Sequence, residues 1–378
     1  MKIILAPDKF KGSLSAIEVC NAIEKGIKRF DQSVQIIKHP LADGGEGTLT
    51  ILNNFFKLKK RNLIVNNPLF RPCEATYLVS NDTAYIEMAT ASGLQLLSKH
   101  ERNCFYTSSY GTGELILDAV NNGYKNIVLF IGGSATNDAG IGMASALGYN
   151  FYNSNNQLVI PIGKELNNIV RIEKTDLKID LNSIKCTVIC DVKNELYGPN
   201  GAAYIYASQK GSNADQIEQL NQGLINFSNQ VELFLDKKIA AIPGAGAAGG
   251  IGAGAFCFLN AKLQSGIDFV LEHTNFNTIV NSDIDLIITG EGSVDKQTLE
   301  GKVVSGVASK ASLFKIPFII VSGIAQDVKQ LQSAFNPTAM YSIMDLGVTQ
   351  KEAIAEASKY LNDIGYHLIQ QFTSNKYN

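Results

Sequence analysis

The sequence predicts an α/β protein in which a second, mixed α/β domain is inserted into a domain built on a parallel sheet. Three observations support this fold class: strand and helix patterns alternate in the first 50 residues, the alternation returns near the C-terminus, and the stretch between carries hairpin signals. Alternating strands and helices imply parallel pairing, whereas hairpins imply antiparallel pairing. A chain of 378 residues is also longer than one ordinary core requires, which favours two domains.

The N-terminal segment reads as two strand–helix pairs. Residues 3–6 form a short apolar run typical of a buried strand, and Ser15 and Glu18 then have the spacing of a capping box. After the box, apolar residues recur every three or four positions, which predicts one buried helix face. Residues 34–37 predict a second strand, and a second helix is expected from Thr48, after the loop LADGGEGT.

The C-terminal segment repeats this alternation. The predicted strands are residues 285–288, 316–321 and 340–344, and the predicted helices begin near Gly301 and span residues 351–371. We therefore expect residues 1–60 and 280–378 to form one discontinuous domain with a Rossmann/flavodoxin-like parallel sheet.

The middle of the chain carries different signals. Residues 75–79 and 83–88 flank Ser-Asn-Asp, which predicts a hairpin, and a second hairpin is expected between residues 151–152 and 158–160. These pairs predict an inserted mixed α/β domain at residues 61–279. The alternative is two consecutive domains divided near residue 150.

Composition excludes several function classes. The net charge is −2 and no long run of like charge occurs, which argues against a nucleic-acid or membrane-surface partner. The first apolar run is too short for a signal peptide, and no segment has the roughly 18 apolar residues of a membrane span, so a cytoplasmic protein is expected. The six cysteines form no CxxC pair, which favours buried reduced thiols over a metal or redox pair.

Five loops carry the polar residues that could perform chemistry, and each follows a predicted strand. They read APDKFKGSLSA, LADGGEGT, GGSATNDAGIG, CDVKNELYGPNGAA and TGEGSVDKQTLEGK. Ligands of open α/β sheets bind at this end of the strands, where the N-termini of helices offer free N–H groups to anions. We therefore expect the ligand to be a small anion.

The first two loops combine lysines, acids and glycines. Lys9 and Lys11 could hold a carboxylate or a phosphate, although two solvated lysines beside a helix cap would look the same. Asp43 and Glu46 stand among glycines, which let the backbone approach a ligand closely.

The other three loops suggest phosphate and metal chemistry. Gly132, Gly133 and Ser134 follow an apolar strand in the manner of a phosphate cradle, and Asp191 ends another strand, where a base or metal ligand could stand. The fifth loop groups acids, which can hold Mg²⁺, with lysines, which can neutralise phosphate.

The set of residue types favours phosphoryl transfer over other reactions. That reaction depends on positioning, Mg²⁺ and charge neutralisation, and the chain shows neither a His-based triad nor a set of zinc ligands. It also lacks a Walker A motif. Residues 244–249 match GxGxxG but lack a clear preceding strand and a following acidic strand end, so a nicotinamide site is discounted.

Taken together, the loops resemble those of the type I glycerate kinases. The matching segments also include ATASGL, TSSYGTGELI and GAGAAGGIG, and they run in the family's order from residue 1 to beyond residue 300. The resemblance implies ATP-dependent phosphorylation of glycerate with Mg²⁺, and two α/β domains with the active site in the cleft between them. Among the products known in that family, 2-phosphoglycerate is expected in preference to 3-phosphoglycerate.

We assign roles to individual residues from their positions after strands. The expected catalytic residues are Lys9, Asp191 and Asp295, of which both aspartates are also expected Mg²⁺ ligands. The expected substrate-binding residues are Lys11, Ser13, Asp43, Gly44, Gly45 and Glu46. The expected nucleotide-binding residues are Gly132, Gly133, Ser134, Asn137, Glu291 and Lys302.

Three other functions stay open at this point. The chain could phosphorylate another small hydroxy acid or polyol, it could bind a sugar acid as a sensor without catalysis, or it could use GAGAAG in a nicotinamide-dependent reductase. The sequence leaves open whether the protein is a monomer or a homodimer.

Overall fold

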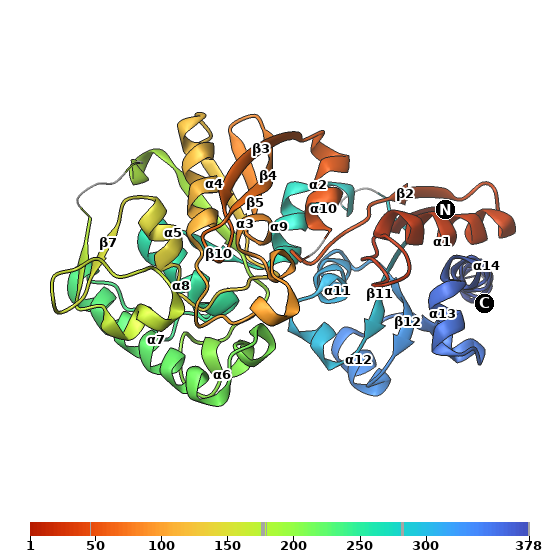
Figure 1. Ribbon diagram of the computed structural model, residues 1–378. Coiled ribbons are helices and arrows are strands. Elements are labelled where there is room, and N and C mark those ends of the chain that lie inside the picture. Colours follow the sequence, from red (N-terminus) through yellow and green to blue (C-terminus); the bar gives the residue numbers. More distant parts are fainter. Residues whose placement is uncertain (46, 175–177, 179, 281–282, 377–378) are drawn as a thin grey trace. The chain divides into compact units, whose positions relative to one another are not determined.

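The computed structural model describes residues 1–45, 47–174, 178, 180–280 and 283–376. It divides into two compact units (Figure 1). Unit 1 consists of Met1–Phe55 and Ser265–Asn378, and unit 2 is the continuous segment Phe56–Gln264 between them. Unit 1 contains a parallel sheet and unit 2 a mixed sheet, which confirms the predicted mixed α/β class.

The sheet of unit 1 has five parallel strands in the order β13-β12-β11-β1-β2. Their bounds are β1 (Lys2–Leu5), β2 (Gln35–Lys38), β11 (Leu286–Val294), β12 (Phe318–Ala325) and β13 (Ala339–Ser342). The chain adds β2 on one side of β1 and the later strands on the other side. The order therefore reverses between β1 and β11, and such a switch point is where open α/β sheets bind ligands.

Helices cover both faces of this sheet. The helices α1 (Ala16–Phe30) and α14 (Ala357–Lys376) lie side by side on one face, and α11 (Val303–Phe314) lies on the other (Figure 1). The helices α9 (Gly266–His273) and α10 (Phe276–Val280) pack against α11. The core between the sheet and the α1–α14 pair is aliphatic, with Ile3, Leu5 and Ile288 buried from the sheet side.

The start of α1 and its contact with α14 follow directly from the sequence. Ser15 Oγ accepts a hydrogen bond from the Glu18 N–H, and Glu18 Oε2 accepts one from the Ser15 N–H at 2.8 Å, which confirms the capping box. Gly26 allows the two helices to approach, because a Cβ there would lie 1.9 Å from the Asn362 carbonyl oxygen.

The sheet of unit 2 has six strands in the order β10-β9-β6-β5-β4-β3. Their bounds are β3 (Lys59–Asn66), β4 (Pro72–Ser80), β5 (Thr83–Glu87), β6 (Asn126–Phe130), β9 (Lys185–Ile189) and β10 (Lys262–Gln264). The pairs β3–β4 and β4–β5 are antiparallel and the other pairs are parallel. The first predicted hairpin is confirmed as β4–β5, with Val79 opposite Ala84.

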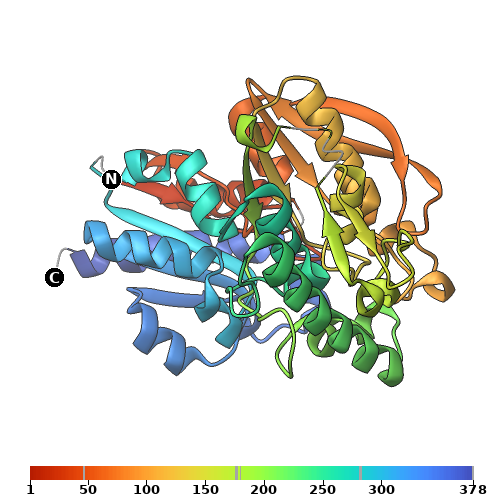
Figure 2. The ribbon, with the colours of Figure 1, turned by 90° about the vertical axis from the view of Figure 1, so that its left-hand side faces the viewer.

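Helix α8 (Ala247–Leu259) joins the two hydrophobic cores of unit 2. Its residues Ala247, Ile251 and Ala255 belong to the core over the sheet, whereas Ala253 and Phe258 belong to a second core. That second core includes α7 (Ala214–Leu235), which lies on the periphery of the unit, away from β3 and β4 (Figures 1 and 2).

The remaining α-helices complete the two units. They are α2 (Thr48–Phe56), α3 (Ala89–Ser92), α4 (Tyr110–Asn121), α5 (Ile141–Ala146), α6 (Ala202–Tyr206), α12 (Val328–Phe335) and α13 (Gln350–Ala355). The predicted helix at residues 351–371 is in fact two helices, α13 and α14, because Glu356 leaves the helical conformation between them.

The second predicted hairpin has a different partner. β7 (Asn150–Tyr152) pairs with β8 (Arg171–Glu173), and residues 158–160 contribute only an isolated bridge between Leu158 and Tyr152. Leu158 and Ile160 are 61% and 60% exposed, so their apolar character does not reflect burial in a sheet.

The strands β11 and β12 extend beyond their predicted ends. Their pairing continues through Ser293 with Ile324 and Val294 with Ala325, so the first part of the segment predicted as a loop, up to Val294, is strand. Glycine is required at position 290, because a Cβ there would lie 1.7 Å from the Val321 carbonyl oxygen on β12. Both strands therefore carry polar residues past the sheet core without leaving regular structure.

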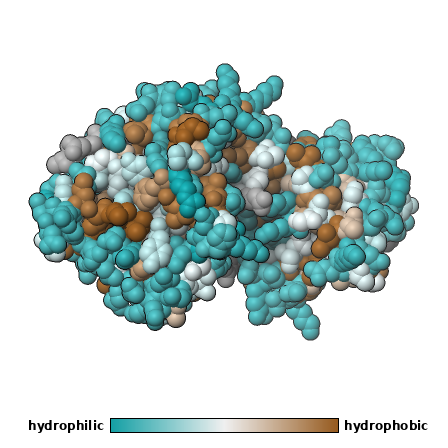
Figure 3. Space-filling model, in the orientation of Figure 1, coloured by the Kyte–Doolittle hydropathy of each residue, from teal (hydrophilic) through white to brown (hydrophobic). Residues whose placement is uncertain are grey.

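Figure 3 shows one face that is mainly hydrophilic, with apolar residues in small groups, as is usual for globular proteins. Within the described part of the chain, none of the helices has the length and hydropathy that a membrane-spanning helix needs. The six cysteines, all in described positions, are free thiols, and four of them are buried.

Candidate functional site

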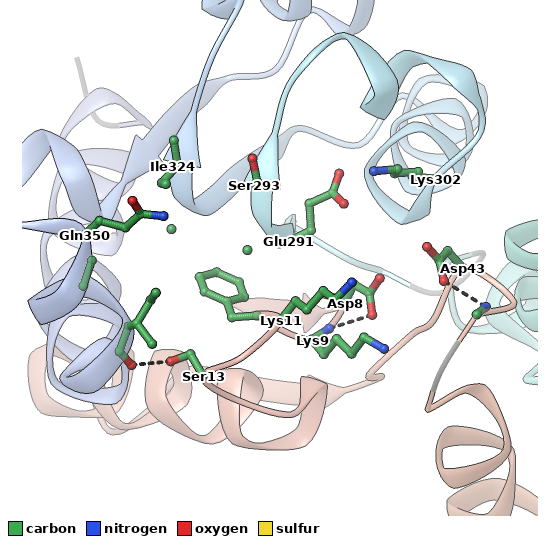
Figure 4. A pocket seen from close by; sticks show the side chains of 16 residues that line it. Asp8, Lys9, Lys11, Ser13, Asp43, Glu291, Ser293, Lys302, Ile324 and Gln350 are labelled. Carbon is green, nitrogen blue, oxygen red and sulfur yellow. Dashed lines mark hydrogen bonds between the residues drawn. The ribbon is translucent and has the colours of Figure 1, made fainter. Parts of the chain in front are cut away.

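A cavity of about 460 Å³ opens in unit 1 where β1, β11 and β12 end (Figure 4). It lies at the switch point of the parallel sheet. Its charged and polar lining residues come from the loops after β1 and β2, from β11, and from the N-termini of α11 and α13. They are Asp8, Lys9, Lys11, Ser13, Asp43, Glu291, Ser293, Lys302 and Gln350.

The loop after β1 is fixed by backbone hydrogen bonds. The Asp8 N–H donates to the Gly290 carbonyl at 2.8 Å, which continues the pairing of β1 with β11. A tight turn follows, in which Phe10 and Leu14 exchange backbone hydrogen bonds of 2.8 and 2.9 Å. The loop lies directly against β11, because a Cβ at Gly292 would be 3.1 Å from the Lys11 nitrogen. This packing directs the loop's side chains to the cavity.

Asp8 is a buried carboxyl group on the cavity lining, with only 6% of the residue exposed. Its Oδ1 accepts a hydrogen bond of 2.6 Å from the Lys9 N–H. Burial and the negative charges of Asp43 and Glu291 raise the pKa of Asp8 to about 7, against the lowering effect of Lys9. An aspartate that titrates near neutral pH is suited to transferring protons.

Glu291 is a second buried carboxyl group in the same cavity. It is 7% exposed, and its Oε1 accepts a hydrogen bond of 2.8 Å from the Thr298 hydroxyl. Burial raises the pKa of Glu291 to about 6, while Thr298 and the positive charge of Lys302 oppose the shift. Lys302 is the N-cap residue of α11, follows a short 3₁₀ helix in the chain, and brings its charge to the cavity lining.

The loop after β2 brings Asp43 and Gly45 to the cavity. Asp43 Oδ1 accepts a hydrogen bond of 3.0 Å from the Gly45 N–H, and Gly44 between them has a φ of 94°, which glycine adopts without strain. Gly44 itself is buried. The predicted substrate residue Glu46 lies outside the described residues.

Two further predicted residues of unit 1 have structural contacts. Ser13 lines the cavity, and its hydroxyl donates to the Ile354 carbonyl on α13 at 2.6 Å. Asp295 is the N-cap of the 3₁₀ helix Lys296–Glu300, where its Oδ1 accepts from the Gln297 N–H at 2.8 Å. Asp295 is partly exposed but is not among the residues that line the cavity.

The other predicted residues belong to unit 2. Gly132 and Gly133 form an exposed turn directly after β6, whereas Ser134 is buried. Asn137 is fully buried, and neither polar atom of its side chain has a hydrogen-bond partner. Asp191 is partly exposed and lies two residues beyond the end of β9.

Two buried charges hold the loop after β6. Lys210 is 4% exposed and donates to Ser134 Oγ at 2.7 Å and to the Thr136 carbonyl at 2.8 Å, and burial lowers the pKa of this lysine to about 8. Asp138 is fully buried and accepts hydrogen bonds from the Ser109 N–H and hydroxyl at 2.8 and 2.7 Å. Burial also raises the pKa of Asp138.

Sequence reasoning missed two of these residues for different reasons. Asp8 follows its strand in the same way as Lys9 does, so the rule that selected the lysines could have selected it. Lys210 meets Ser134 across 76 positions of the chain, and no local pattern indicates such a contact.

The residues present fit a Mg²⁺ ion that is shared with a nucleotide better than one that the protein holds alone. Among the described residues, no three acidic, histidine or cysteine side chains are arranged to hold a metal ion together. Magnesium in kinases is usually bound through one or two carboxylates and the substrate phosphates. Asp191 and Asp295 are partly exposed carboxylates, and each can supply one such ligand.

Comparison with known proteins places the whole chain in one group. Residues 3–373 match the family model described as the glycerate kinase family. The glycerate kinase of Halalkalibacterium halodurans is 39% identical over 99% of both chains, and the glycerate 2-kinase of Escherichia coli K12 is 40% identical over 94% of both. A crystal structure of a protein named as a glycerate kinase 2 from Salmonella typhimurium LT2 matches with a TM-score of 0.85 and 35% identity over 100% of both chains.

Proposed function

Because the chain belongs to the glycerate kinase family, we propose that it transfers the γ-phosphoryl group of ATP to glycerate, and that the cavity of unit 1 binds glycerate. The observation that supports this use of the cavity is its charge arrangement. Lysine side chains from the loop after β1 and from the start of α11 line the same cavity as a buried carboxyl group that titrates near neutral pH.

Glycerate would be recognised by its carboxylate and its two hydroxyl groups. Lys9 and Lys11 are positioned on the cavity lining to neutralise the glycerate carboxylate or the phosphoryl group in transfer. Asp43, with the backbone of Gly44 and Gly45, offers acceptors and donors for the hydroxyl groups. The cavity volume of about 460 Å³ leaves room for the transferred phosphoryl group beside this small substrate.

The nucleotide would be held by groups suited to phosphate. The exposed Gly132–Gly133 turn and Ser134 are proposed to contact phosphate groups, and Glu291 and Lys302 are likewise proposed as nucleotide-binding residues. Asp191 and Asp295 would be the carboxylate ligands of Mg²⁺. When bound, Mg²⁺ would neutralise charge on the phosphate oxygens.

We propose 2-phosphoglycerate as the product, in preference to 3-phosphoglycerate. The support for this choice is the name of one relative, the glycerate 2-kinase of Escherichia coli, which is 40% identical to this chain. The Halalkalibacterium halodurans relative is named only as a glycerate kinase.

A coupled assay of ADP release across several acceptors tests the function. The proposal predicts turnover with D-glycerate and ATP that exceeds turnover with glycolate, tartronate or glycerol by at least tenfold in kcat/KM. Preference for another acceptor would assign the chain to a different hydroxy acid. Binding of glycerate without ADP release would indicate a sensor, and oxidation of NADH would indicate a reductase.

A further inference from the structure

The carboxyl group of Asp8 lies on the cavity lining and is held in place by hydrogen bonds. Its backbone is tied to β11 through the Gly290 carbonyl, and one carboxyl oxygen accepts the 2.6 Å hydrogen bond from the Lys9 N–H. The residue is 6% exposed, and it lines the cavity that also contains Lys9 and Lys11 (Figure 4). A substrate hydroxyl bound between these lysines would therefore meet a fixed acceptor.

The charges around Asp8 come from its own loop and from three other elements that border the cavity, whereas β12 and α13 contribute only uncharged residues. Two acids and three lysines line the cavity with it: Asp43 from the loop after β2, Glu291 from β11, Lys9 and Lys11 from its own loop, and Lys302 from the start of α11. Burial and the two acids favour the protonated form of Asp8, which raises its pKa to about 7, whereas Lys9 favours the ionised form. A general base works best when its pKa lies near the operating pH.

We infer that Asp8 is the general base that accepts the proton of the attacking glycerate hydroxyl. This inference rests on the proposed function. As the hydroxyl oxygen forms its bond to the γ-phosphorus of ATP, the bond from that phosphorus to the β,γ-bridging oxygen breaks and ADP leaves with the electron pair. The hydroxyl proton passes to the Asp8 carboxylate, which later releases it to solvent.

Other carboxylates suit this role less well. Glu291 accepts a hydrogen bond from the Thr298 hydroxyl. Asp295 caps a 3₁₀ helix and is not among the residues that line the cavity. Asp43 accepts the Gly45 N–H and holds the turn of its loop. Glu291 is as buried as Asp8 and lies on β11, but Thr298 and the positive charge of Lys302 oppose the rise of its pKa, which reaches only about 6, whereas the pKa of Asp8 is raised to about 7.

The test compares Asp8→Asn with the wild-type chain in steady-state kinetics as a function of pH. We expect kcat to fall at least 100-fold, while the KM values for glycerate and ATP and the Mg²⁺ concentration at half-maximal rate change less than threefold. In the wild type, kcat/KM for glycerate should fall below about pH 7 with a slope of one proton. Asp8→Asn should not show this fall in kcat/KM at acidic pH, which is called the acidic limb below.

Two further variants control the comparison. Asp8→Glu keeps a carboxylate, so it should retain an acidic limb at a reduced kcat, and this variant serves if Asp8→Asn does not fold. Asp363→Asn removes an exposed carboxylate on α14 that pairs with Arg29, and it should keep the wild-type rate and limb.

Each other outcome overturns the inference. A kcat for Asp8→Asn within threefold of the wild type would show that no proton passes to this residue in a rate-limiting step. A raised Mg²⁺ requirement with the acidic limb retained would make Asp8 a metal ligand instead. A wild-type chain that consumes no ATP with glycerate would overturn the proposed function first, and this inference with it.

Discussion

Lys210 and Ser134 join two distant parts of unit 2 through a buried hydrogen bond of 2.7 Å. The same ammonium group binds the Thr136 carbonyl, so one cation holds the inner end of the loop whose outer end is the exposed Gly132–Gly133 turn. A buried lysine is costly unless its donors are paired. The contact therefore serves to fix the loop in one conformation.

Replacement of Lys210 should weaken nucleotide binding. We expect Lys210→Met to raise the KM for ATP at least tenfold with a smaller change in the KM for glycerate, because the proposed phosphate loop loses its anchor. Steady-state kinetics with each substrate varied in turn measures both values. Lys238→Met, at an 87% exposed side chain of the same unit, is the matched control and should leave both unchanged. Equal effects on both substrates would contradict the assignment.

Loss of the Lys11 charge should weaken the binding of glycerate rather than that of ATP. Lys11 is exposed on the cavity lining, and a hydrogen bond to a charged group contributes about 1.5–3 kcal/mol, so Lys11→Met should raise the KM for glycerate about 10- to 100-fold. Lys25→Met, at an exposed position of α1, is the control. An unchanged KM for glycerate would exclude Lys11 from substrate binding.

Asp8 should lower the free energy of unfolding of the protein without ligands at neutral and alkaline pH. Its pKa is raised to about 7 in the folded state, so the folded state binds the proton more tightly, and stability is lost as pH rises from about 4 to about 7. A difference of about three pKa units corresponds to at most about 4 kcal/mol. Urea unfolding of Asp8→Asn without ligands should therefore show a gain of about 1–4 kcal/mol over the wild type at pH 8, and little gain at pH 4. A loss of stability at pH 8 would contradict the raised pKa.

His39 should make the fold sensitive to acid. Its Nε2 lies 2.8 Å from Thr274 Oγ1, which itself donates to the Val270 carbonyl, so His39 supplies the proton as a neutral imidazole. Burial between Phe55 and Phe276 lowers the pKa of His39 from 6.5 to about 4.

Because the pKa of His39 is lower in the folded state than in the unfolded chain, the folded state binds fewer protons. The contribution of His39 to stability is therefore lost as the pH falls from about 6.5 to about 4. The contribution of His39 to stability is expected to be about 2 kcal/mol less favourable at pH 5 than at pH 7.5. Urea unfolding should therefore show that His39→Gln gains about 2 kcal/mol relative to the wild type between pH 7.5 and pH 5. An unchanged difference between wild type and variant at the two pH values would show that His39 does not contribute to the acid sensitivity.

Local features of the fold could be predicted from the sequence, and long-range ones could not. The capping box of Ser15 and Glu18 and the hairpin β4–β5 depend on residues a few positions apart, and both predictions are confirmed. β11 was expected to end before Gly290 because glycine and serine are typical of loops. Pairing with β12 overrides that preference, since Ser293 and Ile324 are still partners.

Some residues of the candidate site could also be predicted from the sequence, and others could not. The sequence placed Lys9, Lys11 and Asp43 after their strands, and all three line the cavity. Asp8 is tied to β11 by the hydrogen bond from its N–H to the Gly290 carbonyl, a contact between distant parts of the chain that no local pattern encodes. The anchor of the phosphate loop, Lys210, is likewise visible only in the folded chain.

Phosphorus NMR of the product formed from D-glycerate and ATP identifies both the reaction and the hydroxyl group that is phosphorylated. The proposed function predicts the appearance of ADP together with a phosphomonoester signal that is split by the single proton on C2, as in 2-phosphoglycerate. A signal split by two protons would identify 3-phosphoglycerate and contradict the proposed product. Spectra that retain only ATP would contradict the assignment as a glycerate kinase.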